Sequence, residues 1–517
     1  MVPSMTQPGP ATRGLLDRRL CWVVLTIASL AATFGSVSSS AEAGTKIRPP
    51  TNFVLLMSDD QGWGEVAHAD HSRLQTPTLD DMAAAGLRFE RFYAAAPICS
   101  PTRASVMTGR HPNRSGVLSR NYALRPEEIT LPALLRQAGY RTAHFGKWHL
   151  GPVKADSPVN PGAFGFDAYL SADRAFNIDD VLNRNGTRPI VFSGEGSEII
   201  VQEAIHFMLD ARAEGRPFFV VIWFGSPHQP YQGISKDLFR YGGGFGELAK
   251  RYAEITAMDR AIGRVRHALR KLKVADNTLV WFCSDNGPPR HVEENGGLRG
   301  HKGDLYEGGI RVPGIVEWPG VVAKGRVAAS PAVTTDIFAT ILDVAGIAPP
   351  DRPLDGVSLK PLLEGREGVR APIGFWQYPA ATEHGNPLWL SEADLLGVAH
   401  PRSPRVPARF YNFRHPVPKT DDFRGGAVWM DGRWKLLLLN PATDGAPVRS
   451  ELFDLSRDAA ERDDVSAGNP AVVARMRREL DAWRRDVEHS LSGRDYDSAP
   501  ALERSRTSVN PPPQPGR

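Results

Sequence analysis

Three long apolar runs, each ending abruptly in polar residues, dominate the pattern of this sequence. They cover residues 53–57, 218–224 and 278–283, and unbroken apolar runs of this length are typical of strands buried on both faces of a parallel sheet. Helical patterns lie between them, including a long amphipathic stretch at residues 248–272. Strands that alternate with helices predict an α/β fold with a mostly parallel sheet flanked by helices.

A polar motif follows each of these three predicted strands. Asp59 and Asp60 follow the first, residues 226–228 (Ser-Pro-His) the second, and Asp285 and Asn286 the third. Ligands of open parallel sheets bind beyond the carboxyl ends of the strands. We therefore expect these motifs to meet in one site.

The pattern changes after about residue 363. Residues 427–439 have the pattern of a hairpin that turns at Asp431-Gly432, residues 451–455 that of a strand, and residues 471–487 that of a helix. These features predict a smaller C-terminal α+β domain containing an antiparallel sheet.

The N-terminus has the features of an export signal. Two arginines at 18–19 precede an uncharged, largely apolar run at 20–40, and Ala-Glu-Ala at 41–43 is a typical cleavage site. We expect a cleaved signal peptide, an exported (periplasmic or secreted) protein and no stable membrane span after cleavage. The alternative is an uncleaved anchor, because the run approaches the ~20 residues that span a bilayer. The expected divisions are a signal peptide at 1–43, a large α/β domain at 44–365, the smaller domain at 366–490 and a disordered, proline-rich tail at 491–517.

Composition excludes several classes of protein. The chain has 517 residues, 41% hydrophobic and 23% charged, which excludes a wholly disordered, collagenous or polytopic membrane protein. A net charge of +4 is too balanced for a protein whose main ligand is nucleic acid. Three cysteines cannot form a disulfide framework. Cys21 lies in the predicted signal peptide and Cys283 in a predicted buried strand, which leaves Cys99 to be explained.

Cys99 opens the motif C-x-P-x-R, which ends at Arg103. Further along the chain, residues 139–149 read G-Y-x-T-x-x-x-G-K-x-H and end with Lys147 and His149. In these two motifs the chain resembles the formylglycine-dependent type I sulfatases of the alkaline phosphatase superfamily. The segments SPHQP and LRGHKG are most similar to the branch of arylsulfatase A and N-acetylgalactosamine-6-sulfatase. The resemblance implies an alkaline-phosphatase-like fold and a catalytic domain at 44–365.

The candidate metal ligands are the polar residues at two strand ends. Asp59, Asp60, Asp285 and Asn286 offer only oxygen atoms, which favours a hard cation, Ca²⁺ or Mg²⁺, over zinc. Carboxylates that crowd together repel, and a divalent ion relieves the repulsion. The resemblance implies one calcium ion per chain, with Mg²⁺ less favoured, and an oxygen on the modified side chain of Cys99 as a further ligand.

The resemblance also implies the roles of the catalytic residues. A formylglycine-generating enzyme would oxidise Cys99 to formylglycine, whose hydrate is the nucleophile that attacks sulfur. Arg103 and Lys147 would hold this group, and His149 would take its second proton as sulfate leaves. His228 and Lys302 would lie on the side of the leaving alcohol. The expected reaction is hydrolysis of an aryl or carbohydrate sulfate monoester to an alcohol and inorganic sulfate.

Two other functions remain open at this stage. Relatives with the same superfamily fold hydrolyse phosphate or phosphonate esters, and some of them also use formylglycine. A non-catalytic carbohydrate-binding protein could also retain the fold, although such a protein is expected to lose a metal ligand or Cys99. The sequence does not indicate which sulfate ester is the substrate.

Overall fold

The computed structural model describes residues 50–496, except residues 188, 243–245, 293, 367, 379–386, 399–406, 415–422, 424 and 440–447. The described residues lie in one compact unit that begins at Pro50. The predicted signal peptide with Cys21 and residues 497–517 of the predicted tail lie outside the described residues. Within the described ranges, no helix is long and apolar enough to cross a membrane.

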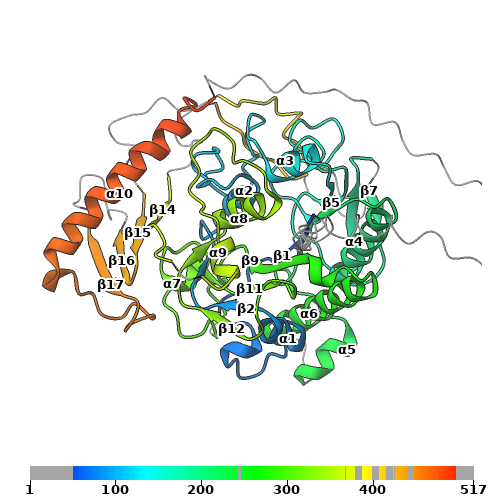
Figure 1. Cartoon of the computed structure of the whole chain (residues 1–517), viewed down its shortest axis with the longest axis horizontal. Coiled ribbons are helices and arrows are strands. Elements are labelled where there is room, and N and C mark those ends of the chain that lie inside the picture. Colours follow the sequence, from blue (N-terminus) through cyan, green and yellow to red (C-terminus); the bar gives the residue numbers. More distant parts are fainter. Residues whose placement is uncertain are drawn as a thin grey trace, which may run out of the picture. The chain divides into compact units, whose positions relative to one another are not determined.

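A ten-stranded sheet forms the centre of the fold (Figure 1). Its five central strands are parallel, in the order β9, β1, β8, β4 and β5, and antiparallel strands join on both sides. The three predicted apolar strands are confirmed as β1, β8 and β9. The strands of this sheet are β1 (Asn52–Ser58), β2 (Leu87–Phe89), β4 (Arg141–Lys147), β5 (Ala168–Ala172), β6 (Val181–Arg184), β7 (Pro189–Val191), β8 (Phe218–Trp223), β9 (Thr278–Ser284), β11 (Gly314–Glu317) and β12 (Arg326–Ala328).

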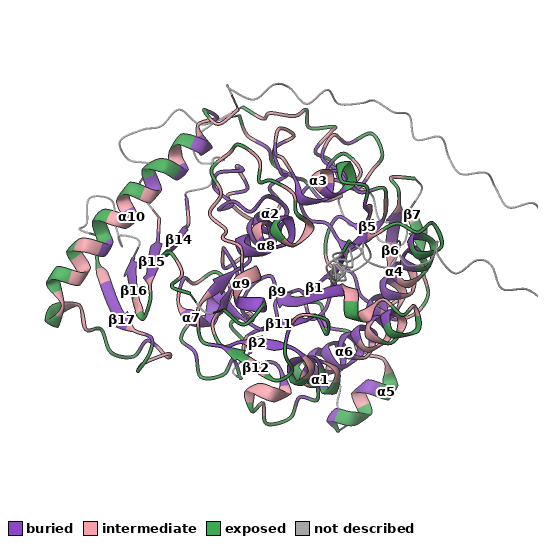
Figure 2. Cartoon of the chain, in the orientation of Figure 1, coloured by how far each residue is buried: buried purple, intermediate pink, exposed green. Residues whose placement is uncertain are grey.

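The two faces of the sheet bury two separate apolar cores. Along β1, Phe53, Leu55 and Met57 join the core beneath α2, α3 and α8, whereas Val54 and Leu56 join the core beneath α1, α4 and α6. Each large side chain that is fully buried contributes about 1.5–3 kcal/mol. This two-sided burial is the reason for the unbroken apolar runs, and it confirms the predicted α/β class (Figure 2). These helices are α1 (Pro77–Ala85), α2 (Cys99–Thr108), α3 (Leu131–Gln137), α4 (Gly196–Ala213), α6 (Glu247–Lys271) and α8 (Thr335–Ala345).

The C-terminal region forms a separate antiparallel sheet, as predicted. Its strands are β14 (Ile373–Trp376), β15 (Ala427–Asp431), β16 (Trp434–Leu438) and β17 (Ser450–Asp454), and α10 (Pro470–Leu491) packs against them. The predicted hairpin joins β15 to β16, and Gly432 in its turn has a left-handed φ of 59°. The remaining elements are η1 (Ala67–Ala69), β3 (Phe92–Tyr93), α5 (Ser235–Leu238), η2 (Phe239–Tyr241), η3 (Ala275–Asn277), α7 (Glu307–Ile310), β10 (Arg311–Val312), β13 (Ala332–Val333), α9 (Lys360–Leu363) and η5 (Ser466–Gly468).

The segment after α2 joins the large domain to this C-terminal sheet. Arg114 forms ion pairs with Asp355 at 2.8 Å and with Asp486 of α10 at 2.6 Å. His111 is buried beside it, edge-on to the ring of Trp483. The segment after α2 is therefore held by the large domain on one side and by α10 on the other.

We predict that His111 makes the fold sensitive to acid. Burial lowers the pKa of His111 from 6.5 to about 3, so below pH 6.5 the unfolded chain binds a proton that the folded chain does not. Stability should therefore fall as the pH falls, by about 1.4 kcal/mol per pH unit from this group. His111→Gln keeps an acceptor for the Trp376 N–H but cannot titrate.

Urea unfolding at pH values between about 7 and 5 tests this prediction. Over this range we expect His111 alone to lower the free energy of unfolding by about 2 kcal/mol. All other titratable groups are the same in wild type and His111→Gln. The difference between the two slopes of unfolding free energy against pH therefore isolates the contribution of His111. Parallel slopes in wild type and His111→Gln would contradict the prediction.

Candidate active site

The polar motifs that follow β1, β8 and β9 meet at one edge of the main sheet. Ser58 and Ser284 are paired at the ends of β1 and β9, so Asp59 and Asp285 follow at the same level. Backbone hydrogen bonds continue this pairing past the strands, from the Asp59 N–H to the Ser226 carbonyl at 3.0 Å and from the Asp285 N–H to the Ser58 carbonyl at 3.2 Å. The parallel register thus brings together segments that are far apart in the sequence.

Three carboxylates and one amide crowd into this buried site. Asp60 has a left-handed φ of 66°, and its N–H donates to Asp285 Oδ1 at 3.0 Å. The Asn286 side-chain amide donates to Asp60 Oδ1 at 2.8 Å. Asp59, Asp285 and Asn286 are fully buried, and Asp60 is 4% exposed.

Cys99 and Arg103 reach this cluster from the first turns of α2. They lie four residues apart and therefore on the same helix face. Pro101 fits the first turn, where its missing N–H would have had no helical partner. Every residue of α2 is buried. The spacing of C-x-P-x-R thus places a thiol and a guanidinium together at a buried helix start.

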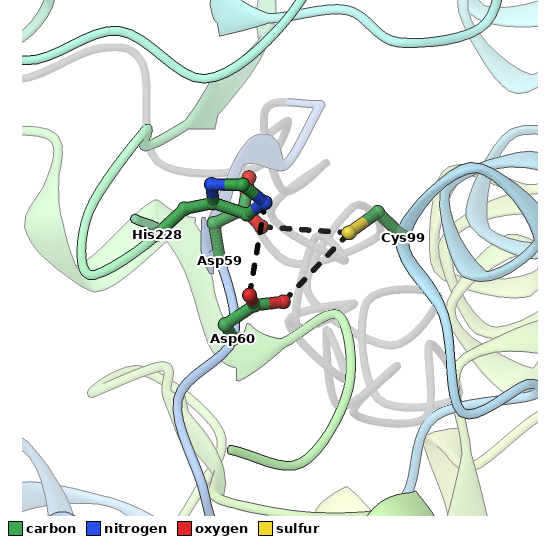
Figure 3. Close-up of side chains that lie close together, drawn as sticks. All are labelled: Asp59, Asp60, Cys99 and His228. Atoms are coloured by element: carbon green, nitrogen blue, oxygen red, sulfur yellow. Dashed lines mark hydrogen bonds and ion pairs between the residues drawn. The ribbon is translucent and has the colours of Figure 1, made fainter. Parts of the chain in front are cut away.

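Figure 3 shows the Cys99 side chain pointing between two carboxylates. Its Sγ lies 3.5 Å from Asp59 Oδ1 and 3.8 Å from Asp60 Oδ1. His228 Nε2 lies 3.7 Å from Asp60 Oδ2. One possible ligand atom from each of these four residues lies within 4.8 Å of the others.

Positive side chains surround the carboxylates. Lys147 Nζ lies 2.5 Å from Asp59 Oδ2, and Lys302 Nζ contacts both Asp60 oxygens at 2.5 and 2.8 Å. Arg103 donates to Asp59 at 3.1 Å and to Asp285 at 2.8 Å, and its guanidinium lies over the Trp223 ring. Lys147 and Lys302 therefore pair with different carboxylates of the cluster.

These cations compensate the carboxylates unequally. Burial raises the pKa of Asp59, but nearby cations, Lys147 foremost, outweigh it and hold that pKa well below its ordinary value. Burial and repulsion by Asp59 instead raise the pKa of Asp285, despite the contact with Arg103. Three carboxylates buried this close together repel each other, and a divalent cation bound among them would relieve that repulsion.

The donor atoms fit a hard divalent cation. The carboxylates of Asp59, Asp60 and Asp285 supply oxygen ligands, which Ca²⁺ and Mg²⁺ prefer. Among the described residues, Asn286 Oδ1 is buried without a hydrogen-bond partner, and a buried oxygen of this kind is costly unless it is bound by a ligand. This oxygen is free to act as a ligand at the centre of the acidic cluster.

His149 lies at the margin of this cluster and has a different partner. Its Nε2 lies 2.7 Å from Asn121 Oδ1, and its Nδ1 is buried with no hydrogen-bond partner in the described ranges. The ring of Phe410 packs against it, and the Tyr411 N–H donates to the Asn121 carbonyl at 2.8 Å. A segment between β14 and β15 thus lines the site, a contact that the sequence pattern does not reveal.

Arg251 also supports the site and was not predicted from the sequence. It lies on the buried face of α6, forms an ion pair with Glu65, and donates to the Asp60 carbonyl at 2.6 Å and the Pro227 carbonyl at 2.8 Å. Both partners of the ion pair are fully buried. Arg251 therefore connects the loop after β1 to the loop after β8.

We predict that Arg251→Met lowers the free energy of unfolding by about 3–5 kcal/mol, because it leaves the Glu65 carboxylate buried without its partner. Lys250→Met on the same helix is the control and should change stability by less than about 0.5 kcal/mol. The double variant Glu65→Leu/Arg251→Met should recover part of the loss. Denaturant unfolding measures all three, and equal losses at positions 250 and 251 would contradict the prediction.

Comparisons with known proteins agree with this geometry. The Sulfatase family profile matches residues 51–347. N-acetylgalactosamine-6-sulfatase of Sus scrofa is 31% identical over 483 residues, which cover 86% of this chain and 87% of that protein. Arylsulfatase A of Bos taurus is 34% identical over 457 residues, which cover 81% of this chain and 84% of that protein.

The fold also matches solved structures. The crystal structure of Ps i-CgsB superposes with a TM-score of 0.69 at 24% identity, over 86% of this chain and 97% of that one. The alkaline-phosphatase-like fold expected from the resemblance is thus confirmed. The matched profile covers more than half of the chain, and relatives over 30% identical align along most of their own length. The chain therefore belongs to the sulfatase family and is a sulfuric ester hydrolase.

Proposed function

We propose that this chain is an exported, calcium-dependent sulfatase that uses formylglycine derived from Cys99 to hydrolyse an aryl or carbohydrate sulfate. The observation that carries the proposal is the position of Cys99, which starts a buried helix and points between Asp59 and Asp60. Cationic side chains lie on both sides of that point. This arrangement suits a nucleophile that must meet an anionic ester.

The acidic cluster is the proposed calcium site. Asp59, Asp60, Asp285 and Asn286 would hold the ion, together with an oxygen on the modified residue 99. When bound, calcium supplies positive charge that favours an ionised oxygen nucleophile near neutral pH, and formylglycine is the source of that oxygen. The crowded carboxylates and the buried Asn286 Oδ1, which has no hydrogen-bond partner among the described residues, support this assignment.

The cations of the chain have distinct proposed tasks. Sulfate esters carry negative charge on their non-bridging oxygens, and preorganised cationic donors stabilise charge that develops there in the transition state. Lys147 and Arg103, both buried, would orient the side chain at position 99. Lys302 and His228 are partly exposed and would face the leaving alcohol.

His228 has the geometry of a proton donor to that alcohol. Its Nδ1 lies 2.6 Å from the Gln229 carbonyl, which accepts a hydrogen and therefore fixes a proton on Nδ1. Its Nε2 faces the site, 3.7 Å from Asp60 Oδ2. His149 is the proposed proton acceptor that completes turnover.

The relatives support the class of substrate. Both relatives reported above are sulfatases, one named for N-acetylgalactosamine 6-sulfate and the other for aryl sulfates. We accordingly propose a sulfated carbohydrate or aryl ester as substrate, and a formylglycine-generating enzyme as the partner during maturation. The second candidate is hydrolysis of phosphate or phosphonate esters on the same site.

We predict a clear preference for sulfate over phosphate. A singly charged sulfate ester suits the limited number of cations here, whereas a phosphate dianion brings further negative charge toward buried carboxylates. Rates on 4-nitrophenyl sulfate, 4-nitrophenyl phosphate and a phenylphosphonate ester test this, with kcat/KM for sulfate higher by at least about tenfold. A preference for either phosphorus ester would favour the second candidate.

We also predict that Cys99, and not Cys283, is essential and modified. Both cysteines are buried and free in the structure, so Cys283→Ala is a matched control for Cys99→Ala. Cys99→Ala should lose activity by about a thousandfold or more, and Cys283→Ala should retain it.

Mass spectrometry of the active enzyme checks the chemistry behind that loss. The Cys99 peptide should be lighter than its unmodified form by the mass of H₂S less one oxygen. Full activity with an unmodified thiol at position 99 would overturn the proposed nucleophile.

A further inference from the structure

One side-chain contact at the site belongs to neither the acidic cluster nor its cations. Asn121 Oδ1 lies 2.7 Å from His149 Nε2, and Asn121 is the hydrogen-bond partner of that ring in the structure. Asn121 is distant in sequence from every motif that identified the site. It lies in the segment that follows α2, which the C-terminal region anchors.

The chemistry of this contact determines which nitrogen of the ring carries the proton. The side-chain oxygen of Asn121, Oδ1, can only accept a hydrogen bond, so Nε2 of His149 must be the donor. A neutral imidazole has one N–H, and Nδ1 is therefore the nitrogen with the free lone pair. Within the part of the chain that the structure describes, Nδ1 is buried and has no hydrogen-bond partner. The lone pair is thus available for a proton from the reaction.

The surroundings of His149 keep the ring neutral until that proton arrives. Burial lowers the pKa of His149 well below its ordinary value, and the charges of Lys147 and Arg103 lower it further. The ring of Phe410 packs edge-on against the His149 ring.

Three features of the backbone fix Asn121 in place. Its N–H donates to Ser100 Oγ at 3.1 Å, inside the C-x-P-x-R motif. Its carbonyl accepts from the Tyr411 N–H at 2.8 Å. Its φ of 63° is left-handed, a conformation that asparagine tolerates better than most residues. The amide is thus held between the nucleophile's helix and the C-terminal segment.

We propose that Asn121 is a positioning residue that holds His149 in the tautomer whose Nδ1 accepts the proton during turnover. The inference rests on the proposed function, in which His149 is the proton acceptor. In this role, one hydroxyl of the hydrated residue 99 would lose its proton to Nδ1. The O–H electron pair would then form the C=O bond of the restored aldehyde, and the C–O bond to sulfate would break with its electrons leaving on the sulfate. The resulting imidazolium retains its Nε2–H bond to Asn121.

The left-handed backbone alone would also favour asparagine, so the variants must separate the two roles. Asn121→Gly keeps the backbone preference and removes the amide. Asn121→Asp tolerates the same backbone and keeps an oxygen acceptor for Nε2. A backbone role predicts that Gly is harmless, whereas the positioning role predicts that Asp is much closer to wild type than Gly.

The first test reads the tautomer directly and needs no turnover. Nitrogen-15 NMR of histidine-labelled protein with an unmodified Cys99 reports which ring nitrogen of His149 is protonated, with His149→Gln to assign the signals. We expect a protonated Nε2 and a free Nδ1 in wild type and Asn121→Asp, and a mixture in Asn121→Gly. A protonated Nδ1 or a mixture in wild type would overturn the proposal.

The second test is kinetic and uses the modified enzyme. Loss of an outer hydrogen-bond partner typically costs 10- to 100-fold in activity, so kcat of Asn121→Gly should fall by about that factor. KM should fall with it, leaving kcat/KM nearly unchanged, because His149 acts after the sulfate has been transferred. Asn121→Asp should recover most of kcat, and thermal unfolding should show that both variants are folded.

The outcomes of the two tests distinguish this proposal from the proposed function. Wild-type kcat in Asn121→Gly, or equal losses in Gly and Asp, would overturn the positioning role even in an active sulfatase. A wild-type enzyme that hydrolyses no sulfate ester would overturn the proposed function instead. In that case the NMR measurement would still decide by itself whether Asn121 fixes the tautomer of His149.

Discussion

The crowding of three buried carboxylates at the end of two neighbouring strands is the constraint on which the site depends. Asp59, Asp60 and Asp285 are brought together by the parallel register of β1 and β9, which the apolar cores on both faces of the sheet enforce. Charges buried this closely are expensive unless they are paired or bind an ion. Much of the surrounding structure consists of groups that compensate this charge.

That compensation comes from segments far apart in the chain. Arg103 projects from α2, Lys147 from the end of β4 and Lys302 from a loop, and each contacts a carboxylate. Arg251 holds the backbone of the same loops from α6. The same cations that stabilise the carboxylate cluster are the groups suited to an anionic substrate, so stability and catalysis share one set of residues.

The sequence predicts the strands and their polar ends well, because both follow from local patterns. Burial on both faces of the sheet requires the apolar run at residues 53–57, and the acidic pair Asp59 and Asp60 comes shortly after this run in the sequence. The contacts of Arg251 and Asn121 could not be predicted in this way. Arg251 is one charged residue on a helix with many, and Asn121 lies outside every catalytic motif and meets His149 only in the folded chain. The assigned roles of the site residues themselves stay predictions.

The central proposal for this site is that the acidic cluster binds a divalent cation. Calorimetric titration of Ca²⁺ into chelator-treated protein tests it most directly, with Mg²⁺ as the comparison and Asn286→Leu as the control variant. The account predicts one calcium ion per chain, a higher melting temperature when it is bound, weaker binding of Mg²⁺, and a marked loss of calcium affinity in the variant. If neither ion produces binding heat or a change in melting temperature, the proposal is contradicted.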